Sequence, residues 1–320
     1  MDRRHFLFLL SVGLPGAGLG GCGGCGQSLH EKKAAFLTTH EEPEKKSEEE
    51  PKEKEATFGE DKALLRYRFK KGEELCWNVQ QTLKMKNIIG GMEENIETKS
   101  RSVKIWKTLD VDSQGAAIFE YRVEDVDMRQ AQTGRDDAVF NSRRDKVIPP
   151  EFANLEGKIG VPLAHIKIDI QGQTTKKPLR EYEGSVSENR IVIPLPDDAI
   201  SSGSSWSASK LIELPQQDRT IKKIKTRQEF TLEKLHSGLA TIKFAAFPFT
   251  PLTAQEEMQL LELFATGTME LDLEAGHFIR QEATIDKMVV GVQGASDSIR
   301  YLSRLTECCC GRKACEICNV

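Results

Sequence analysis

The sequence predicts a mostly β protein built of large antiparallel sheets, with one or two short helices. From Leu64 onward, apolar and polar residues alternate instead of recurring at helical spacing. Each alternating run is short and bounded by Gly, Asp, Ser or Pro, which is typical of antiparallel strands with one buried face. Helix signals occur at only two places. The strand-rich body, residues 62–305, is long enough to bury a sizeable core.

Residues 1–21 have the organisation of an export signal peptide. Arg3 and Arg4 precede a short apolar run, and small residues and glycines follow. The run is too short to span the bilayer core as a helix, which takes about 20 predominantly apolar residues, so a cleaved signal is the better interpretation. Arg3 and Arg4 resemble a twin-arginine export motif, although Arg pairs are also common in general signals.

Residues 19–22 (LGGC) resemble a bacterial lipobox. The resemblance implies that Cys22 becomes the new N-terminus and carries several acyl chains, such as palmitate, which together anchor a protein stably. We therefore expect an exported protein, lipid-anchored to a bacterial membrane and facing the periplasm or the cell exterior. The alternative is an ordinary cleaved signal in which Cys22 is incidental.

Residues 22–61 are expected to form a disordered tether. Residues 41–55 contain eight Glu and four Lys, a local charge of −4, and few large apolar residues occur in the segment. Because the formal net charge of the chain is also −4, the other residues sum to zero. Nucleic-acid binding needs clustered Lys and Arg, so a nucleic-acid partner is not expected.

The body contains nine alternating runs. In the first of them Trp77 shares one face with Leu75, Val79, Leu83 and Met85, and Trp206 opens a later strand, so both tryptophans are expected to be buried. The apolar residues of the expected strands fall within 75–85, 103–111, 117–123, 166–170, 191–195, 230–232, 242–244, 269–273 and 290–292.

Several segments occur twice in the body, which indicates two duplicated halves, 62–185 and 186–305. Trp77 corresponds to Trp206, the turn at 113–115 to that at 236–238, and residues 168–172 to 271–276. The alternative is that any all-β protein repeats strand, turn and strand.

Two segments carry helix signals. Thr253 and Glu256 have the spacing of a capping box before apolar residues at helical spacing. Residues 149–155 place Pro at the start of a short helix.

Catalytic motifs are not found in the sequence, so we expect no enzyme, no catalytic residue and no cofactor. The body contains His165, His236 and His277 far apart, without the partners that acid–base catalysis requires. Residues 110–115 (DVDSQG) begin like a calcium loop, but Tyr121 stands where the final acidic ligand belongs, so a hairpin turn is expected.

Residues 306–320 form a cysteine-rich tail. Disulfides are typical of an exported chain, but a Cys-x-x-Cys pair with a further Cys also suits zinc or an iron–sulfur cluster, or a redox pair. Bridges from the triplet at 308–310 to the last two cysteines are expected, with the fifth thiol pairing with Cys76 or with a second molecule. The five cysteines are Cys308, Cys309, Cys310, Cys315 and Cys318.

Residues 67–77, 111–116, 195–206 and 267–276 together resemble a family of exported bacterial proteins of unknown function. The alternation and length also resemble the half-open barrel of periplasmic lipoprotein carriers. This resemblance implies large curved, half-open barrel-like sheets and a non-catalytic binding protein for lipid, another apolar ligand or an envelope protein partner. Alternatives are a structural or interaction lipoprotein without a small ligand, and a metal-binding protein using the cysteine tail. The residues expected to line an apolar ligand site are Trp77, Phe119, Tyr121, Trp206 and Phe244.

Overall fold

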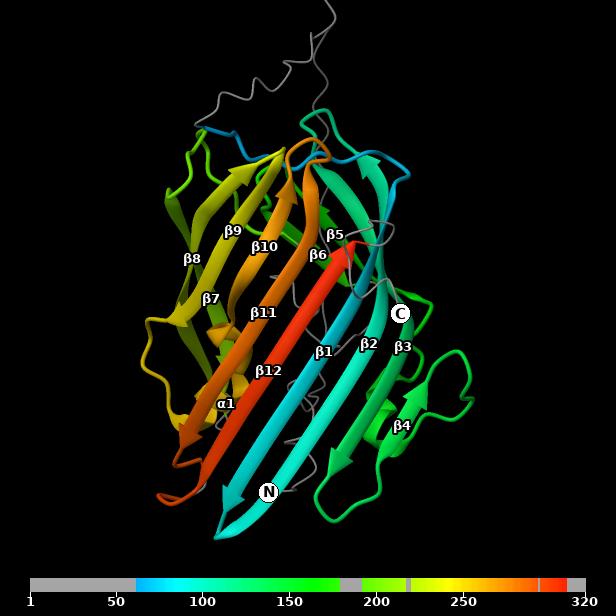
Figure 1. Ribbon diagram of the computed structural model, residues 1–320, viewed down its shortest axis with the longest axis vertical. Helices are drawn as coiled ribbons and strands as arrows, with labels where there is room; N and C mark the ends of the chain where they lie inside the picture. The colour runs from blue at the N-terminus through cyan, green and yellow to red at the C-terminus, as the bar shows by residue number, and fades with distance from the viewer. Residues whose placement is uncertain (1–61, 179–191, 217–219, 293, 310–320) are drawn as a thin grey trace, which may run out of the picture. The chain divides into compact units, whose positions relative to one another are not determined.

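The computed structural model describes residues 62–178, 192–216, 220–292 and 294–309. They form one 12-stranded antiparallel sheet, in the order β6-β5-β3-β2-β1-β12-β11-β10-β9-β8-β7, with β4 paired to β3 (Figure 1). The sheet does not close, because β6 and β7 lie at its two ends. The predicted mostly β fold with large antiparallel sheets is therefore confirmed. The strands are β1 (Glu74–Ile89), β2 (Met92–Val111), β3 (Ala117–Gln132), β4 (Ala138–Asn141), β5 (Pro162–Ile168), β6 (Thr174–Pro178), β7 (Ser205–Pro215), β8 (Ile221–His236), β9 (Leu239–Pro248), β10 (Thr266–Asp272), β11 (His277–Val290) and β12 (Ser298–Cys309).

Short helices occur at both predicted places. The 3₁₀ helix η2 (Pro150–Leu155) follows β4, and α1 (Ala254–Gln259) and the 3₁₀ helix η4 (Leu261–Phe264) follow β9. The capping box before α1 is formed as expected, with reciprocal bonds between Thr253 and Glu256. Within the described ranges, no helix has the length and apolar character needed to cross a bilayer.

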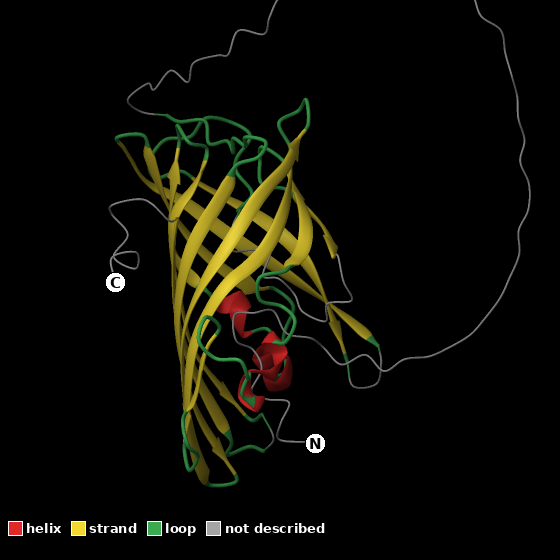
Figure 2. Ribbon diagram, turned by 90° about the vertical axis from the view of Figure 1, so that its right-hand side faces the viewer, coloured by secondary structure: helices red, strands yellow, loops and turns green. Residues whose placement is uncertain are grey.

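The sheet curls about one buried face, which we call the inner face (Figure 2). In β1 the alternation gives this face correctly, since Trp77, Val79, Leu83 and Met85 are buried. In β2 it does not. The register places Lys104 opposite Trp77 and Trp106 opposite Leu75, so the inner face of β2 carries these two residues and not Val103 and Ile105. A strand shifted by one residue exchanges its faces, and Val103 and Ile105 are on the outer one.

The two halves of the sheet have the same order of elements. The first runs β1-β2-β3, an excursion with β4 and η2, then β5-β6; the second runs β7-β8-β9, an excursion with α1 and η4, then β10-β11. The repeated turns found in the sequence lie between β2 and β3 and between β8 and β9. β12 is additional and pairs with β1. The expected boundary between the halves lies outside the described residues, and β12 runs to Cys309, four residues beyond the expected end of the body.

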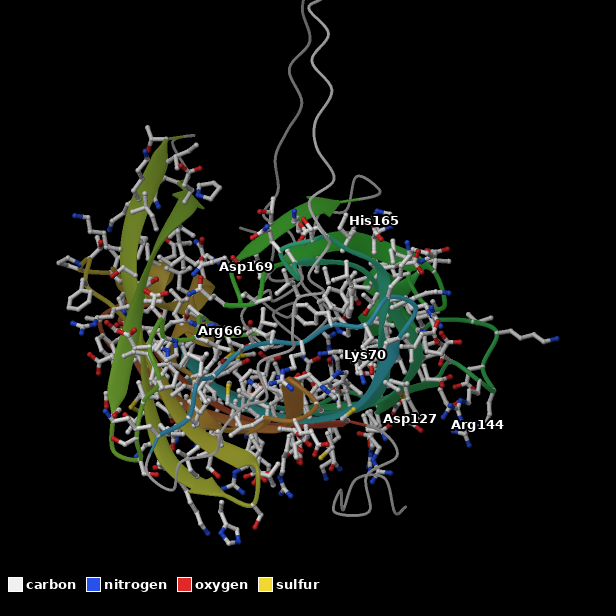
Figure 3. The ribbon with its side chains drawn as sticks, turned by 90° about the horizontal axis from the view of Figure 1, so that it is seen from above. Arg66, Lys70, Asp127, Arg144, His165 and Asp169 are labelled. Atoms are coloured by element: carbon white, nitrogen blue, oxygen red, sulfur yellow. The ribbon has the colours of Figure 1, made fainter. Side chains whose placement is uncertain are left out.

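Two crossing segments, residues 62–69 and 192–200, fill one end of the inner face. Leu65, Tyr67 and Ile193 are buried in the largest apolar cluster. The Tyr67 hydroxyl accepts from the backbone N–H of Ile193 at 2.8 Å and donates to the carbonyl of the same residue at 3.1 Å. Burial raises the pKa of this hydroxyl far above its ordinary value, against the smaller effect of the Ile193 hydrogen bond. Figure 3 shows the segment that carries Arg66 and Lys70 crossing this end of the sheet.

Candidate functional site on the inner face

The five residues expected to line an apolar site all belong to one aromatic cluster on the inner face. Trp77, Phe119 and Tyr121 are buried, whereas Trp206 and Phe244 are half-buried and pack against the same cluster. Both tryptophans are expected to be largely buried, and the structure buries Trp77 more completely than Trp206. β7 is the last strand of the sheet, and Trp206 has a strand neighbour on one side only.

Ring contacts and crossing segments close most of the space around this cluster. The Trp106 ring lies 4.9 Å from that of Tyr121 and 6.0 Å from that of Phe119, centroid to centroid. A cavity among these described side chains measures about 20 Å³, enough for about one water molecule. Around this cavity the aromatic side chains are therefore closely packed. The cavity is lined by Tyr67, Phe69, Leu75, Trp77, Trp106, Phe119, Ile168, Val192, His277 and Phe278.

The middle of the inner face mixes polar and small side chains with a small apolar cluster that includes Val79 and Leu305. The Lys104 ammonium lies 2.8 Å from the Glu307 carboxylate, and the two side chains are only 10% and 3% exposed. Gln81 donates to the Ser303 hydroxyl at 3.1 Å. Small residues occupy further inner-face positions of this region. They are Ser100, Ser102, Gly267 and Ala283, as the pairing of β1 with β2, of β10 with β11 and of β11 with β12 shows.

The other end of the inner face is covered by α1 and η4. Met258 and Leu261 from these helices are buried in a second apolar cluster with residues of β1, β2, β11 and β12. Lys287 of β11 contacts Glu257 at 3.3 Å and lies 4.3 Å from the centroid of the Phe264 ring. The inner face therefore runs from an aromatic end, through a mixed middle that carries a buried ion pair, to an apolar end beneath helices. The sheet members of this second cluster are Leu83, Met85, Ile96, Ile285, Val289, Ile299 and Tyr301.

Sequence reasoning missed Trp106, Lys104 and Glu307. Lone charged residues in a strand are usually exposed, so nothing local marked this pair as buried. Trp106 shares its face with Lys104, and that face could be assigned only from the register with β1.

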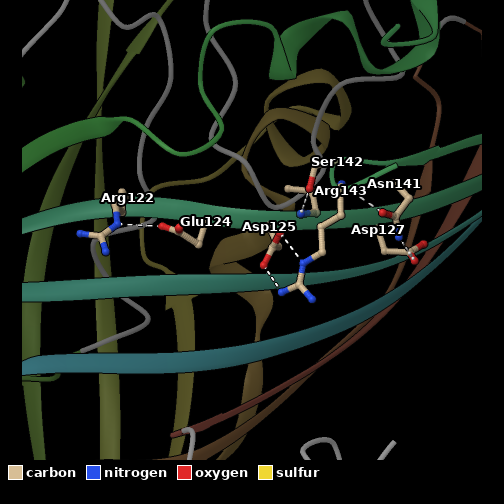
Figure 4. Close-up of polar contacts among 8 residues, drawn as sticks. Arg122, Glu124, Asp125, Asp127, Asn141, Ser142 and Arg143 are labelled. Atoms are coloured by element: carbon tan, nitrogen blue, oxygen red, sulfur yellow. Dashed lines mark hydrogen bonds and ion pairs between the residues drawn. The ribbon is translucent and has the colours of Figure 1, made fainter. Parts of the chain in front are cut away.

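Exposed polar contacts connect β3 to the segment that follows β4 (Figure 4). Arg143 donates to Asp125 at 2.7 Å, and Asn141 donates to Asp127 at the same distance. The hydrogen bond from Arg143 holds the pKa of Asp125 below its ordinary value, against a smaller effect of burial. These contacts join the segment after β4 to β3.

The three body histidines lie on three different strands, and the calcium-like segment forms a hairpin turn. His165, His236 and His277 lie on β5, β8 and β11. Asp112 accepts hydrogen bonds from the backbone N–H groups of Gln114 and Ala116, as expected for a hairpin turn. Its second oxygen lies 2.9 Å from Lys167, whose hydrogen bond lowers the pKa of Asp112.

The cysteines are only partly described. Cys76 of β1 is disulfide-bonded, and Cys308 and Cys309 are buried at the end of β12. Among the residues with described positions, no group of three or more His, Cys, Asp or Glu is arranged to hold a metal ion. The expected sites at Arg3, Arg4, Cys22, Cys310, Cys315 and Cys318 lie outside the described residues.

These features define an open, curled antiparallel sheet whose inner face is apolar at its two ends and mixed in the middle. The sequence matches no protein-family model and shows no significant similarity to a curated protein.

Proposed function

We propose that this protein is a membrane-anchored envelope lipoprotein that binds lipid or another apolar ligand on the inner face of its sheet, without catalysis. The observation that carries the proposal is the distribution of side chains on the inner face. Large apolar clusters occupy its two ends, whereas polar and small side chains and one small apolar cluster occupy the middle. An amphipathic ligand needs both kinds of surface, and ligand sites combine apolar walls with a few placed polar groups.

Lys104 and Glu307 are the groups on the inner face that suit a polar headgroup. They form a buried pair of opposite charges next to the small residues Ser100 and Ser102. An acyl chain would extend from this pair toward the cluster under α1. Export and anchoring through Cys22 belong to the same proposal and are supported by the lipobox-like residues 19–22.

Filling the middle of the inner face tests the binding site. Ser102→Trp places a large side chain on the inner face, whereas Arg101→Trp places the same side chain on the outer face of the same strand. Ser102→Trp should abolish saturable binding of a fluorescent fatty-acid analogue, and Arg101→Trp should leave it unchanged. Ser100→Leu serves as a milder second variant, and circular dichroism checks that each variant is folded.

A structural or interaction lipoprotein is the second candidate, and the small cavity at the aromatic end favours it. Native mass spectrometry of the mature protein separates the candidates, because it reports bound lipid and bound metal together. Co-purified lipid supports the proposal. Absence of lipid together with absence of saturable binding supports the structural candidate, and stoichiometric zinc or iron supports a metal site in the cysteine tail.

The anchor is tested separately. Cys22→Ser should abolish incorporation of labelled fatty acid and move the protein from the membrane fraction toward the soluble fraction. Persistence of the label in this variant contradicts lipidation at Cys22.

A further inference from the structure

Three exposed apolar side chains and two half-buried ones lie near the ends of two neighbouring hairpins. The β1–β2 and β11–β12 hairpins are neighbours because β1 pairs with β12, with Ile88 opposite Ser298 (Figure 1). Met92 is 61% exposed, and Met288 and Val290 are each 59% exposed. We call this group the double-hairpin tip. It consists of Ile88, Ile89, Met92, Met288 and Val290.

A buried aspartate holds the two hairpins together. Asp297 accepts a hydrogen bond from the backbone N–H of Gly90 in the first hairpin at 3.0 Å. Its carbonyl accepts from the N–H of Gly291 in the second hairpin at 2.8 Å. Gly90 and Gly91 have φ values of 58° and 79°, which a two-residue hairpin turn requires. The tip therefore presents its apolar side chains from a fixed backbone.

Paired charges of both signs lie on the outer face beside the tip. Lys86 contacts Glu93 at 2.8 Å, and Arg300 contacts Asp286 at 3.1 Å. A groove of about 410 Å³ lies on the same part of the sheet. Because each of these cations has an acidic neighbour, the zone suits a zwitterionic surface better than an anionic one. The polar residues lining the groove are Lys84, Lys86, Asn95, Glu97, Gln132, Thr133 and Arg300.

We propose that the double-hairpin tip inserts into a zwitterionic lipid bilayer, with the paired charges at headgroup level. A stable protein interface buries about 800 Å² on each partner, and five aliphatic side chains at a narrow hairpin end do not supply such an area. Insertion of a small apolar tip below a polar zone is the arrangement of interfacial membrane binding. The proposal goes beyond ligand binding on the inner face and does not depend on it.

The proposed anchor permits this contact. β1 has 16 residues, so its start lies about 50 Å from the tip. A tether of residues 22–61 reaches up to roughly 130 Å when extended. An anchored body has therefore enough chain to turn the tip toward a bilayer.

Vesicle flotation of the full mature chain carrying Cys22→Ser tests the tip without an acyl anchor. The protein should float with phosphatidylcholine–phosphatidylethanolamine vesicles, reversibly. The double variant Met288→Ser/Val290→Ser, which changes two outer-face residues, should lower the partition coefficient more than about tenfold. The matched control is Val139→Ser/Val147→Ser, which removes two exposed valines elsewhere and should leave partitioning unchanged. Met92→Trp should show a blue-shifted, lipid-quenched emission.

Four outcomes overturn the proposal. The first is absence of flotation, and the second is an equal loss of vesicle partitioning in the tip and control variants. The third is binding that requires anionic phosphatidylglycerol and disappears at high salt. The fourth is a dimer, seen in sedimentation, that the tip variant loses and the control variant keeps. Saturable fatty-acid binding, measured on the same tip variant, tests ligand binding on the inner face. Failure of membrane insertion is therefore distinguishable from failure of ligand binding.

Discussion

At the residue scale, the buried Lys104–Glu307 pair has the largest expected effect on stability. Lys104→Met leaves the Glu307 carboxylate buried without its counter-charge, which typically costs about 3–5 kcal/mol of folding free energy. Lys104→Met/Glu307→Leu removes both charges and should restore most of that loss. Urea unfolding of both variants measures the effect, and equal losses in the single and double variants would show that packing, not charge, dominates.

A second residue-scale prediction concerns Gly172, in the turn between β5 and β6. A Cβ there would lie 2.2 Å from the Ile193 carbonyl oxygen, and φ is +82°. Gly134 has a similar φ of +73° but no atom within 4 Å of the added Cβ. Gly134→Ala should therefore cost only the positive-φ strain of roughly 1–2 kcal/mol, and Gly172→Ala clearly more. Thermal unfolding compares the two variants. Equal losses of stability would mean that residues 192–200 can move away from the added Cβ without any loss of folding free energy.

The candidate site could be predicted only in part from single residues. Aromatic residues at alternating positions indicated Trp77, Phe119 and Tyr121 because large apolar side chains on one strand face are usually buried. The same reasoning could not find Lys104 or Glu307. Their burial depends on a contact between residues 203 positions apart, which no local pattern encodes.

At the scale of elements, α1 depends on the Glu256 side chain. This carboxylate accepts from the Thr253 N–H and from Lys222, each at 2.8 Å. Burial raises its pKa, but these hydrogen bonds outweigh that effect and hold the pKa below the ordinary value. Glu256→Gln should cost about 1 kcal/mol at neutral pH.

The pH dependence of that loss follows from the sign of the shift. A depressed carboxyl pKa stabilises the fold above the unfolded-state pKa, and this contribution disappears as pH falls through the folded-state pKa. The difference in Tm between wild type and Glu256→Gln should therefore shrink as pH is lowered from about 5 toward 3. A constant difference over this range would mean that the charge contributes nothing.

Element boundaries and faces differed in how well they could be predicted. The capping box and the prolines placed both helices because these signals are local. The buried face of β2 was misassigned because Val103 and Ile105, which lie on the outer face, were grouped with Val111, which follows a bulge at Leu109 and lies on the inner face. A bulge breaks the period of two on which the assignment depends.

At the scale of the whole molecule, β1 and β12 form the centre of the sheet and β6 and β7 its ends. Central strands bond to neighbours on both sides, whereas an edge strand has one unpaired side. Amide hydrogen exchange should therefore be slowest in β1 and β12 and faster in β7. Mass spectrometry of peptic fragments measures this order, and equal protection of β7 would indicate that another chain segment covers it.

The pairing of β1 with β12 also has a consequence for the order of folding. Each half contains hairpins that can form early from neighbouring strands. The pairing of β1 with β12, in contrast, joins residues more than 200 positions apart, such as Gln81 and Ser303. Closing so long a loop is slow, and β1 must wait for the last strand to leave the ribosome. Until then β1 and β11 both remain open edges. A chain cut short before Ser298 would keep them permanently, and such edges template aggregation.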